Sequence, residues 1–516
     1  MPRTLLRAGA VVAAGALAAT LGPSAVAGPD ACSSRTNNTH AKLAECVTLE
    51  GVRAHQAALQ AIADANNDTR VSGSPGYDES VEYVRSTLEK AGYSPTVQSF
   101  TYNTFITLSA TVLEQVSPAP TGPVPVSIMS YSGSGDVTAS VTALTPPPAD
   151  ATPGCEAADF AGFPAGNIAL ISRGGCTFAA KATNAAAAGA SAVVIYNNQA
   201  GVLNGTLSES FALDLPVVSV TQDVGQRLAG TAGLVLRVKT DTFRGEATTY
   251  NVLAETAGGN ADNVVMAGAH LDSVNAGPGI NDNGSGTAAL LETAVQMAKV
   301  KPVNKIRFAW WGAEESGLVG STRYVASLDE AARDRIALYL NFDMVGSPNH
   351  VFFVYDGDDS DGVGAGPGPD GSARIEKTFE AFYSQRGIPF KGTDFSGRSD
   401  YGPFIAAGIP SGGLFTGAEG IKTPEEAQIW GGTAGAQYDP CYHQPCDTYA
   451  NNNDTALDVN SDAIAFAVLQ YGMNTSDVNG VAGKPNFAPV QPTTAGMASD
   501  GRQGGLHDEH EHLSES

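Results

Sequence analysis

The chain has 516 residues, of which 42% are apolar, so it is long enough for two or three domains and is not disordered throughout. Acidic residues outnumber basic ones by 53 to 29, which gives a net charge of −24. A field of that sign repels phosphate backbones and anionic lipids, so we expect neither nucleic acid nor a membrane as a partner.

The first 27 residues are typical of a secretion signal. Arg3 and Arg7 precede an apolar run over residues 8–21, and Ala25-Val26-Ala27 is a small-x-small cleavage site. The run is too short to span a bilayer comfortably, which argues against a membrane anchor. We therefore expect a secreted, extracellular protein.

Six cysteines lie in three local groups. An even number in a secreted chain favours disulfides over free thiols or zinc–thiolate sites. Pairing within each group is a hypothesis that joins Cys32 to Cys46, Cys155 to Cys176, and Cys441 to Cys446.

The sequence that follows the expected secretion signal predicts two helices and a strand. Residues 47–65 have the composition of a helix. In residues 78–91 apolar side chains recur on one helical face, and Gly92 ends that helix. A strand is expected over residues 95–100.

The middle of the chain differs from the parts before and after it, because its sequence shows no group of candidate catalytic or metal-binding residues. Within it, residues 171–198 predict a strand, a loop, an alanine-rich helix and a second strand. Alternating strands and helices resume after Tyr250 and continue to about Gly472. We therefore predict one domain formed by residues 28–104 and 246–474, with residues 105–245 inserted as a second domain.

The C-terminal segment, residues 475–516, is rich in Gly, Pro, Asn and Ala, and we expect it to be flexible. It ends in a histidine-rich stretch around His507, His510 and His512. A solvated tail is the simpler interpretation of that stretch than a metal site.

The most informative stretch is GAHLDSVNAGPGINDN, residues 268–283. Residues 264–267 form an apolar run typical of a buried strand, and His270 and Asp272 follow where that strand should end. Ligands in open α/β sheets lie beyond the carboxyl ends of strands. His270 would bind a metal, and Asp272 would accept its other N–H. A buried hydrogen-bonded pair is the alternative interpretation.

More ligand-type residues follow later strands. After His270 and Asp272 a helix is expected over residues 287–300. A strand expected over 306–311 is followed by Glu314 and Glu315, and a strand expected over 338–342 is followed by Asp343. A later Gly-rich stretch leads to a second histidine, His443, between Cys441 and Cys446. Two histidines with mixed carboxylates suit zinc, and one carboxylate can bridge two ions. The alternative for the adjacent glutamates is an exposed acidic turn.

Six motifs, GAHLDSV, GINDNGSG, WWGAEE, LNFDM, GRSDYGPF and YDPCYHQPCD, resemble those of the secreted double-zinc aminopeptidases, especially the leucine-preferring type of actinomycetes. The resemblance covers residues 47–93 and 249–472. The insert resembles the protease-associated domain in RGGCTF, residues 173–178, and AGASAVVIYNN. The resemblance implies an α/β fold in which helices sandwich a mixed, mainly parallel sheet, interrupted by a small β-rich inserted domain.

The resemblance also implies roles for single residues. His270 and Asp343 would bind one zinc ion, Glu315 and His443 the other, and Asp282 would bridge the two ions. The peptide bond between Asp282 and Asn283 would be cis. Glu314 would be the general base, and Tyr442 would hydrogen-bond the oxyanion. Cys441 and Cys446 would clamp the loop that carries Tyr442 and His443.

The substrate would be a peptide with a free N-terminus, bound by a monomeric enzyme. Met344 and Phe415 would form an apolar pocket, although both also fit a hydrophobic core, and Arg398 would lie at the amine-binding end. Some relatives hold a structural calcium, to which Asp458 and Asp462 correspond. The N-terminal carboxylate of that site aligns with Cys46, which puts the calcium in doubt.

Three alternatives remain from the sequence. A carboxypeptidase needs cations for the substrate's carboxylate, and Arg398 is the one obvious candidate. A single-zinc glutaminyl cyclase would not need both sets of ligands. A binding protein without catalysis would have lost ligands, and all of them are present.

Overall fold

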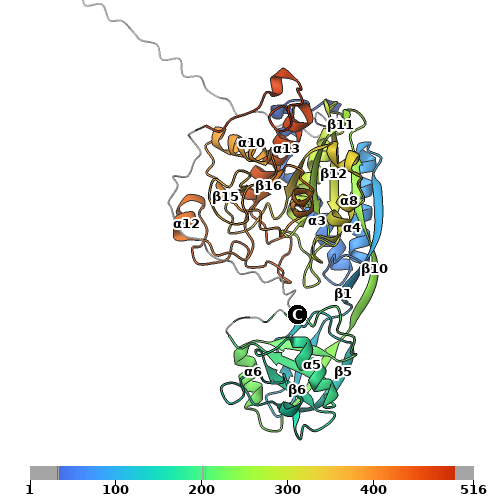
Figure 1. Cartoon of the computed structure of the whole chain (residues 1–516), viewed down its shortest axis with the longest axis vertical. Helices are drawn as coiled ribbons and strands as arrows, with labels where there is room; N and C mark the ends of the chain where they lie inside the picture. Colours follow the sequence, from blue (N-terminus) through green and yellow to red (C-terminus); the bar gives the residue numbers. More distant parts are fainter. Residues whose placement is uncertain (1–31, 33, 200, 202, 204, 494–516) are drawn as a thin grey trace, which may run out of the picture.

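The computed structural model describes residue 32 and residues 34–199, 201, 203 and 205–493 (Figure 1). The expected secretion signal and the histidine-rich stretch lie outside these residues. Among the helices of the described part, none has the length and apolar character needed to cross a membrane.

An eight-stranded mixed sheet forms the centre of the larger domain. Strands β12, β11, β13 and β16 are parallel neighbours, and β10 is antiparallel to β12. From edge to edge the strands are β1 (Thr96–Thr107), β10 (Thr242–Glu255), β12 (Asn304–Trp311), β11 (Asn260–His270), β13 (Ile336–Phe342), β16 (Ser411–Phe415), β14 (Phe353–Tyr355) and β15 (Lys391–Thr393).

Helices cover both faces of this sheet because its central strands are apolar on both sides. In β11, Val265 and Ala267 belong to the core on one face, while Val264 and Met266 belong to the core on the other. The first core includes α3 (Leu49–Ala65), α4 (Pro75–Ala91), α7 (Gly284–Met297), α10 (Ser372–Gln385) and α13 (Asp454–Met473). The second includes α8 (Val319–Ala326) and α11 (Tyr401–Ala406). Three further helices of the larger domain are α2 (His40–Ala44), α9 (Glu330–Asp334) and α12 (Pro424–Trp430).

The expected elements of the larger domain are present, with α7 starting three residues early. The sequence predicts a start at residue 287, because Gly284-Ser285-Gly286 is typical of a turn before a helix. Instead, the side chain of Asn283 accepts a hydrogen bond from the backbone N–H of Gly286, 2.9 Å away, and so caps the helix. The helix therefore begins directly after Asp282 and Asn283.

The insert contains a second eight-stranded sheet. As predicted for residues 171–198, a strand, a helix and a strand follow one another, namely β6 (Ile168–Ser172), α5 (Phe178–Ala187) and β7 (Ala192–Tyr196). In sheet order the strands are β3 (Gly122–Pro123), β2 (Val112–Ser117), β9 (Val235–Thr240), β5 (Gly135–Ala143), β6 (Ile168–Ser172), β7 (Ala192–Tyr196), β8 (Val217–Val220) and β4 (Ser127–Ile128). Helices α5 (Phe178–Ala187) and α6 (Gln222–Ala229) complete it, with a 3-10 turn η1 (Ala157–Phe160).

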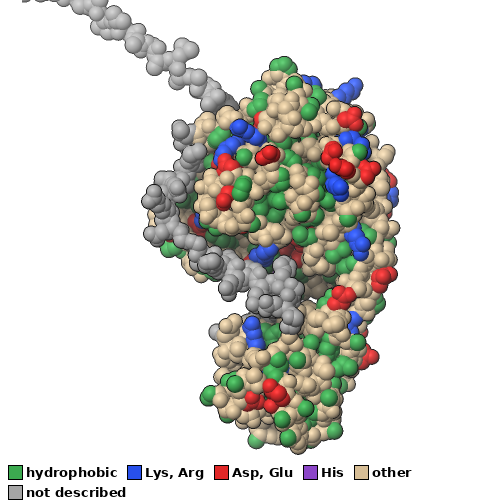
Figure 2. Space-filling view, viewed as in Figure 1, with side chains coloured by type: hydrophobic (Ala, Val, Ile, Leu, Met, Phe, Trp, Pro, Cys, Tyr) green, Lys and Arg blue, Asp and Glu red, His purple; other side chains and the backbone are tan. Residues whose placement is uncertain are grey.

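A two-stranded ribbon joins the insert to the larger domain. Strands β1 and β10 pair from Thr96↔Leu253 to Thr107↔Thr242 and leave the large sheet together. Because β1 runs in the same direction as β12, β11 and β13, the insert lies beyond the edge where those strands end. Gln98 lies in register with the end of β12. From there β1 continues for nine more residues, or about 30 Å, beyond the sheet. Figure 1 shows the ribbon along one side, and Figure 2 shows the insert as a separate lobe.

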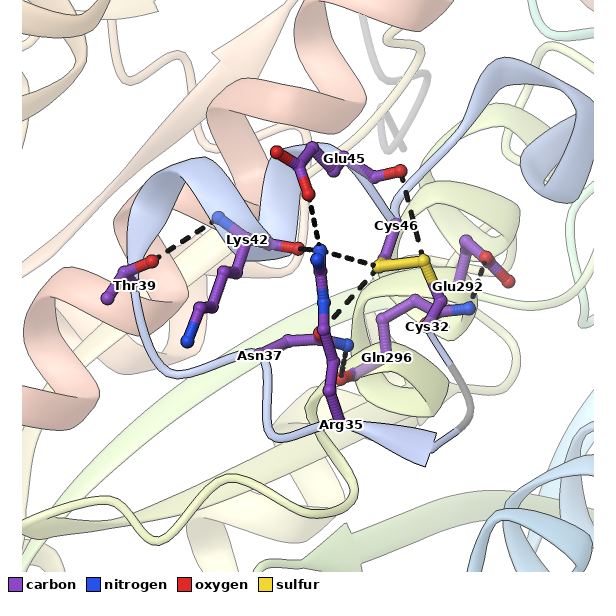
Figure 3. The surroundings of a disulfide bond; sticks show 9 residues. All are labelled: Cys32, Arg35, Asn37, Thr39, Lys42, Glu45, Cys46, Glu292 and Gln296. Atoms are coloured by element: carbon purple, nitrogen blue, oxygen red, sulfur yellow. Dashed lines mark hydrogen bonds and ion pairs between the residues drawn. A yellow bond between two sulfur atoms is a disulfide. The ribbon is translucent and has the colours of Figure 1, made fainter. Parts of the chain in front are cut away.

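The three disulfides have the hypothesised pairing, Cys32–Cys46, Cys155–Cys176 and Cys441–Cys446. Figure 3 shows how the first fixes the N-terminal segment. The guanidinium of Arg35 donates to the carboxylate of Glu45 and to the carbonyl of Lys42, each at 2.7 Å. The side chain of Asn37 donates to the carbonyl of Gln296, in α7, at 2.9 Å. The disulfide and these bonds hold the chain before α3 against the larger domain.

Residues 475–493 differ from the expected flexible tail. Phe487, in the 3-10 turn η2 (Pro485–Phe487), is 3% exposed, and its carbonyl accepts a hydrogen bond from Gln470 at 2.9 Å. The backbone N–H of Thr493 donates to Ser384, also at 2.9 Å. The segment is held by one buried aromatic residue and a few polar contacts, which its low-complexity composition does not indicate.

Candidate metal centre

The candidate ligands come together because three neighbouring parallel strands end at one edge of the sheet. β11 ends at His270, which is paired with Trp311 at the end of β12. Glu314 and Glu315 follow β12, and Asp343 follows β13, the other neighbour of β11. The carboxyl ends of these strands therefore bring one histidine and three carboxylates to the same place.

Asp282 lies between the two histidines. Its Oδ1 is 3.3 Å from Nε2 of His270, and its Oδ2 is 3.2 Å from Nε2 of His443. On one side Asp343 Oδ1 lies 3.3 Å from the same nitrogen of His270, and on the other Glu315 Oε2 lies 3.0 Å from that of His443. The result is two groups of three ligands that share Asp282. The peptide bond from Asp282 to Asn283 is cis, as the resemblance implied.

These residues fit zinc ions. The donors of each group are one imidazole nitrogen and carboxylate oxygens, a set that zinc accepts. Oε1 of Glu315 and Oδ1 of Asp343 are buried and have no hydrogen-bond partner among the described residues. Buried oxygens of this kind are rare unless an ion or water satisfies them. Ser399 Oγ donates to the other oxygen of Asp343 at 2.6 Å and so orients this carboxylate.

Electrostatics separates the roles of Asp282 and Glu314. Burial would raise the pKa of Asp282, but hydrogen bonds from His270 and His443 hold it well below its usual range. For Glu314, burial raises the pKa well above its usual value, and the nearby carboxylate of Glu315 raises it further against the opposing effect of His270. Asp282 is thus held as an anion, whereas Glu314 is suited to take up a proton.

Asp272 supports the glutamates as well as the histidine. Its carboxylate oxygens accept the backbone N–H groups of Glu314 and Glu315 at 3.1 and 3.4 Å. Nδ1 of His270 lies closer to the backbone carbonyl of Asp272, at 3.2 Å, than to the carboxylate, at 3.6 Å. Asp272 therefore orients His270 mainly through its main chain, and its side chain fixes the loop after β12.

Two supporting residues were missed by the sequence reasoning. Arg70 is fully buried and donates to the carbonyls of Leu271, Pro278 and Gly279, which fixes the loop that leads to Asp282. Asp447 accepts the backbone N–H groups of Asn281 and Asp282 at 2.8 and 2.9 Å. Asp447 directly follows Cys446 in a motif already quoted, whereas no sequence pattern marks Arg70.

Tyr442 and His443 lie in the loop that the Cys441–Cys446 disulfide closes. Their rings stack with centroids 3.8 Å apart. Burial, and then the carboxylates of Asp282 and Glu315, raise the pKa of Tyr442 well above its usual value. Arg398 donates to the Tyr442 hydroxyl at 3.0 Å and to Glu419 at 2.8 Å.

A cavity opens on this cluster. Besides the candidate ligands and Glu314, it is lined by the predicted pocket residues Met344 and Phe415 and by Arg398 and Tyr442. Tyr355 and Ala418 add further apolar surface. The structure thus brings together all the catalytic, metal and substrate-pocket residues that the sequence suggested.

The candidate calcium ligands lie elsewhere, on α13. Asp458 is exposed and Asp462 half-buried, and burial, followed by the charge of Asp458, raises the pKa of Asp462 to about 7. Cys46, at the position of the missing carboxylate, is bonded to Cys32. Calcium takes six to eight oxygen ligands, and in the described residues no third acidic side chain or histidine joins this pair. The calcium stays a prediction.

Comparisons with known proteins show the family of the chain and of its insert. The model of "Peptidase family M28" matches residues 251–468, and the model of "PA domain" matches residues 137–228. The chain is 49% identical over 456 residues to an aminopeptidase of Pseudomonas aeruginosa, covering 85% of this chain and 83% of that protein. It is 39% identical to leucine aminopeptidase 2 of Trichophyton rubrum, covering 82% of this chain and 84% of that protein.

A solved structure shows the same architecture. The zinc aminopeptidase of Bacillus subtilis superposes with a TM-score of 0.58 at 27% identity, covering 82% of this chain and 94% of the other.

Proposed function

Since the chain belongs to peptidase family M28 and is a zinc-dependent aminopeptidase, we propose that it removes N-terminal residues, preferably large apolar ones, at a binuclear zinc site. The observation that carries the proposal is the position of Asp282, whose two carboxylate oxygens face two separate histidines. His270 and Asp343 would hold one ion, and Glu315 and His443 the other. When bound, zinc polarises the scissile carbonyl and makes a nearby water more acidic.

The remaining steps fall to the chain's own residues. Glu314 would take a proton from the attacking water and deliver it to the leaving amine, because its raised pKa favours uptake of a proton. Tyr442 would donate a hydrogen bond to the oxygen on which negative charge develops. The loop anchored by Asp272 holds Glu314 in the wall of the cavity, where a substrate would bind.

Recognition of the substrate's ammonium group distinguishes this proposal from a carboxypeptidase. The buried carboxylates of Glu314 and Asp343 line the cavity and suit a cation. Of the Lys and Arg residues in the described part, only Arg398 lines it, and its guanidinium already donates to Glu419 and Tyr442. The cavity therefore offers no uncommitted cation for a substrate carboxylate.

The apolar pocket predicts a preference for substrates with a large apolar N-terminal residue. Burying a Leu-sized side chain against Met344 and Phe415 is worth about 1.5–3 kcal/mol, which corresponds to a preference of roughly 10–100-fold for N-terminal Leu over Gly. A panel of Leu-, Gly- and Glu-peptides with N-acetyl-Leu controls measures this as kcat/KM. We expect poor cleavage of Glu-peptides and none of the acetylated ones. Equal cleavage of free and acetylated peptides would contradict amine recognition.

The insert would limit access to the site by long or folded substrates. It lies beyond the edge of the sheet where the ligands are gathered. Its apolar residues form clusters separate from those of the larger domain, so its removal would not open the larger core. Gating is thus a role that the insert can have without contributing to the chemistry.

Removing the insert tests this role. Thr107 and Thr242 are directly paired across β1 and β10, so replacing residues 108–241 with an Asn-Gly turn should close a hairpin. We expect unchanged kcat/KM for Leu-p-nitroanilide and faster cleavage of folded proteins with a free N-terminus. A folded variant that retains zinc but loses activity on the small substrate would contradict a purely gating role.

A further inference from the structure

Arg398 is well placed to act through Tyr442. It lies between β15 and α11, whereas Glu419 follows β16 and Tyr442 lies in the disulfide loop. Its Nη1 is 2.8 Å from Oε1 of Glu419, and its Nη2 is 3.0 Å from the hydroxyl of Tyr442. A planar guanidinium can make these two bonds at once, which a lysine ammonium on a flexible stem would not reproduce. Arg398 thus joins three loops that line the cavity.

The direction of the hydrogen bond from Arg398 to Tyr442 determines where the hydrogen of the Tyr442 hydroxyl can point. A guanidinium has only donors, so the oxygen of Tyr442 is the acceptor in this contact. The single hydrogen of the hydroxyl is not used there and stays available for another acceptor. The stacking of Tyr442 on His443 fixes the plane of the ring, and the side chain lines the same cavity as Glu314.

From this geometry, and resting on the proposed role of Tyr442, we propose that Arg398 is a positioning residue for the oxyanion donor. By occupying the Tyr442 oxygen as a donor, it directs the phenol hydrogen into the cavity, where the substrate's carbonyl oxygen becomes negative. Glu419 holds the guanidinium in place. Preorganised donors of this kind are effective because they need no reorientation during the reaction.

A double-mutant cycle tests the proposal, with kcat and KM measured for Leu-amide. Loss of an oxyanion donor costs on the order of 10²–10³-fold, so we expect Tyr442→Phe to lower kcat by about 10²-fold. We expect Arg398→Gln to lower kcat by about 10-fold with little change in KM, since the donor stays but is less well oriented. In the Tyr442→Phe background, Arg398→Gln should change kcat by less than about twofold, because the two residues act as a unit.

The controls separate positioning from other effects. Arg398→Lys keeps one donor and should recover part of the activity, and Arg323→Gln, at an exposed arginine of α8, should have no effect. Zinc content and Tm should match the wild type in all variants. If Arg398 instead bound the substrate's carboxylate, its loss would raise KM for the dipeptide Leu-Gly and leave Leu-amide unaffected.

Either that selective rise in KM or additive losses in the cycle would overturn the inference while the proposed function stands. A zinc-loaded wild type that cleaves neither substrate would overturn the proposed function itself.

Discussion

Glu314→Gln is expected to lower kcat by about 10²–10⁴-fold while zinc content and Tm stay at their wild-type values. Glu314 belongs to neither group of three that shares Asp282; it groups instead with His270 and Glu315, and its contact with His270, Oε2 to Nε2, is long at 3.9 Å. The substitution keeps the shape of the side chain and its backbone bond to Asp272 but removes the proton acceptor. Steady-state kinetics with Leu-p-nitroanilide and metal analysis of the same preparation measure both effects.

Two variants serve as controls for this result. Glu315→Gln alters a candidate ligand 3.0 Å from His443, so it should lower zinc content as well as activity. Glu292→Gln changes a buried glutamate in α7 that pairs with His55, and it should leave kcat and zinc content unchanged. Equal loss of zinc from the Glu314 and Glu315 variants would contradict the division of roles between the two glutamates.

The strand ends of the site were predictable because apolar runs of β-strand length are followed directly by ligand-type residues. His270, Glu314 and Asp343 each come within three residues of a strand that the sequence indicates. Their mutual proximity then follows from parallel pairing, which places carboxyl ends at one edge. The distant His443 is a candidate ligand because it lies between two cysteines on one loop, but its pairing with Glu315 came from the resemblance, since no local periodicity leads to that loop.

The supporting residues were not predictable for a physical reason. Arg70 is separated by about 200 residues from the carbonyls it binds, and an arginine in a polar stretch ordinarily indicates a solvated surface. The role of Asp272 was only partly foreseen. A carboxylate two residues after a histidine suggests a local pair, but its actual partners are the N–H groups after the neighbouring strand. Such contacts depend on tertiary structure that spacing does not encode.

The ends of helices and strands were predicted less accurately than their existence and type. Gly284 and Gly286 indicated a turn, but Asn283 caps the helix there and both glycines are inside it. Strand β1 was expected to end at about residue 100, yet it continues to Thr107 as part of the ribbon that carries the insert. For α7 the missed feature is the local cap by Asn283, whereas for β1 the neighbouring strand β10 stabilises backbone that the local sequence would leave irregular.

Removal of the metal should abolish activity completely, because the proposed chemistry needs a polarised carbonyl and an acidified water. Dialysis against a chelator followed by stepwise return of zinc measures this, with Leu-p-nitroanilide turnover followed at each step. Activity that survives chelation in protein shown to be free of metal would contradict zinc catalysis here.

The stoichiometry of zinc tests the central claim most directly. Because Asp282 faces two histidines through separate oxygens, each within its own group of three ligands, we predict two zinc ions per chain in the fully active protein. Native mass spectrometry of the purified mature protein, with kcat measured on the same sample, counts them. Asp343→Ala and Glu315→Ala should each reduce the count toward one. Full activity with a single zinc ion per chain, or with none, would contradict the binuclear site.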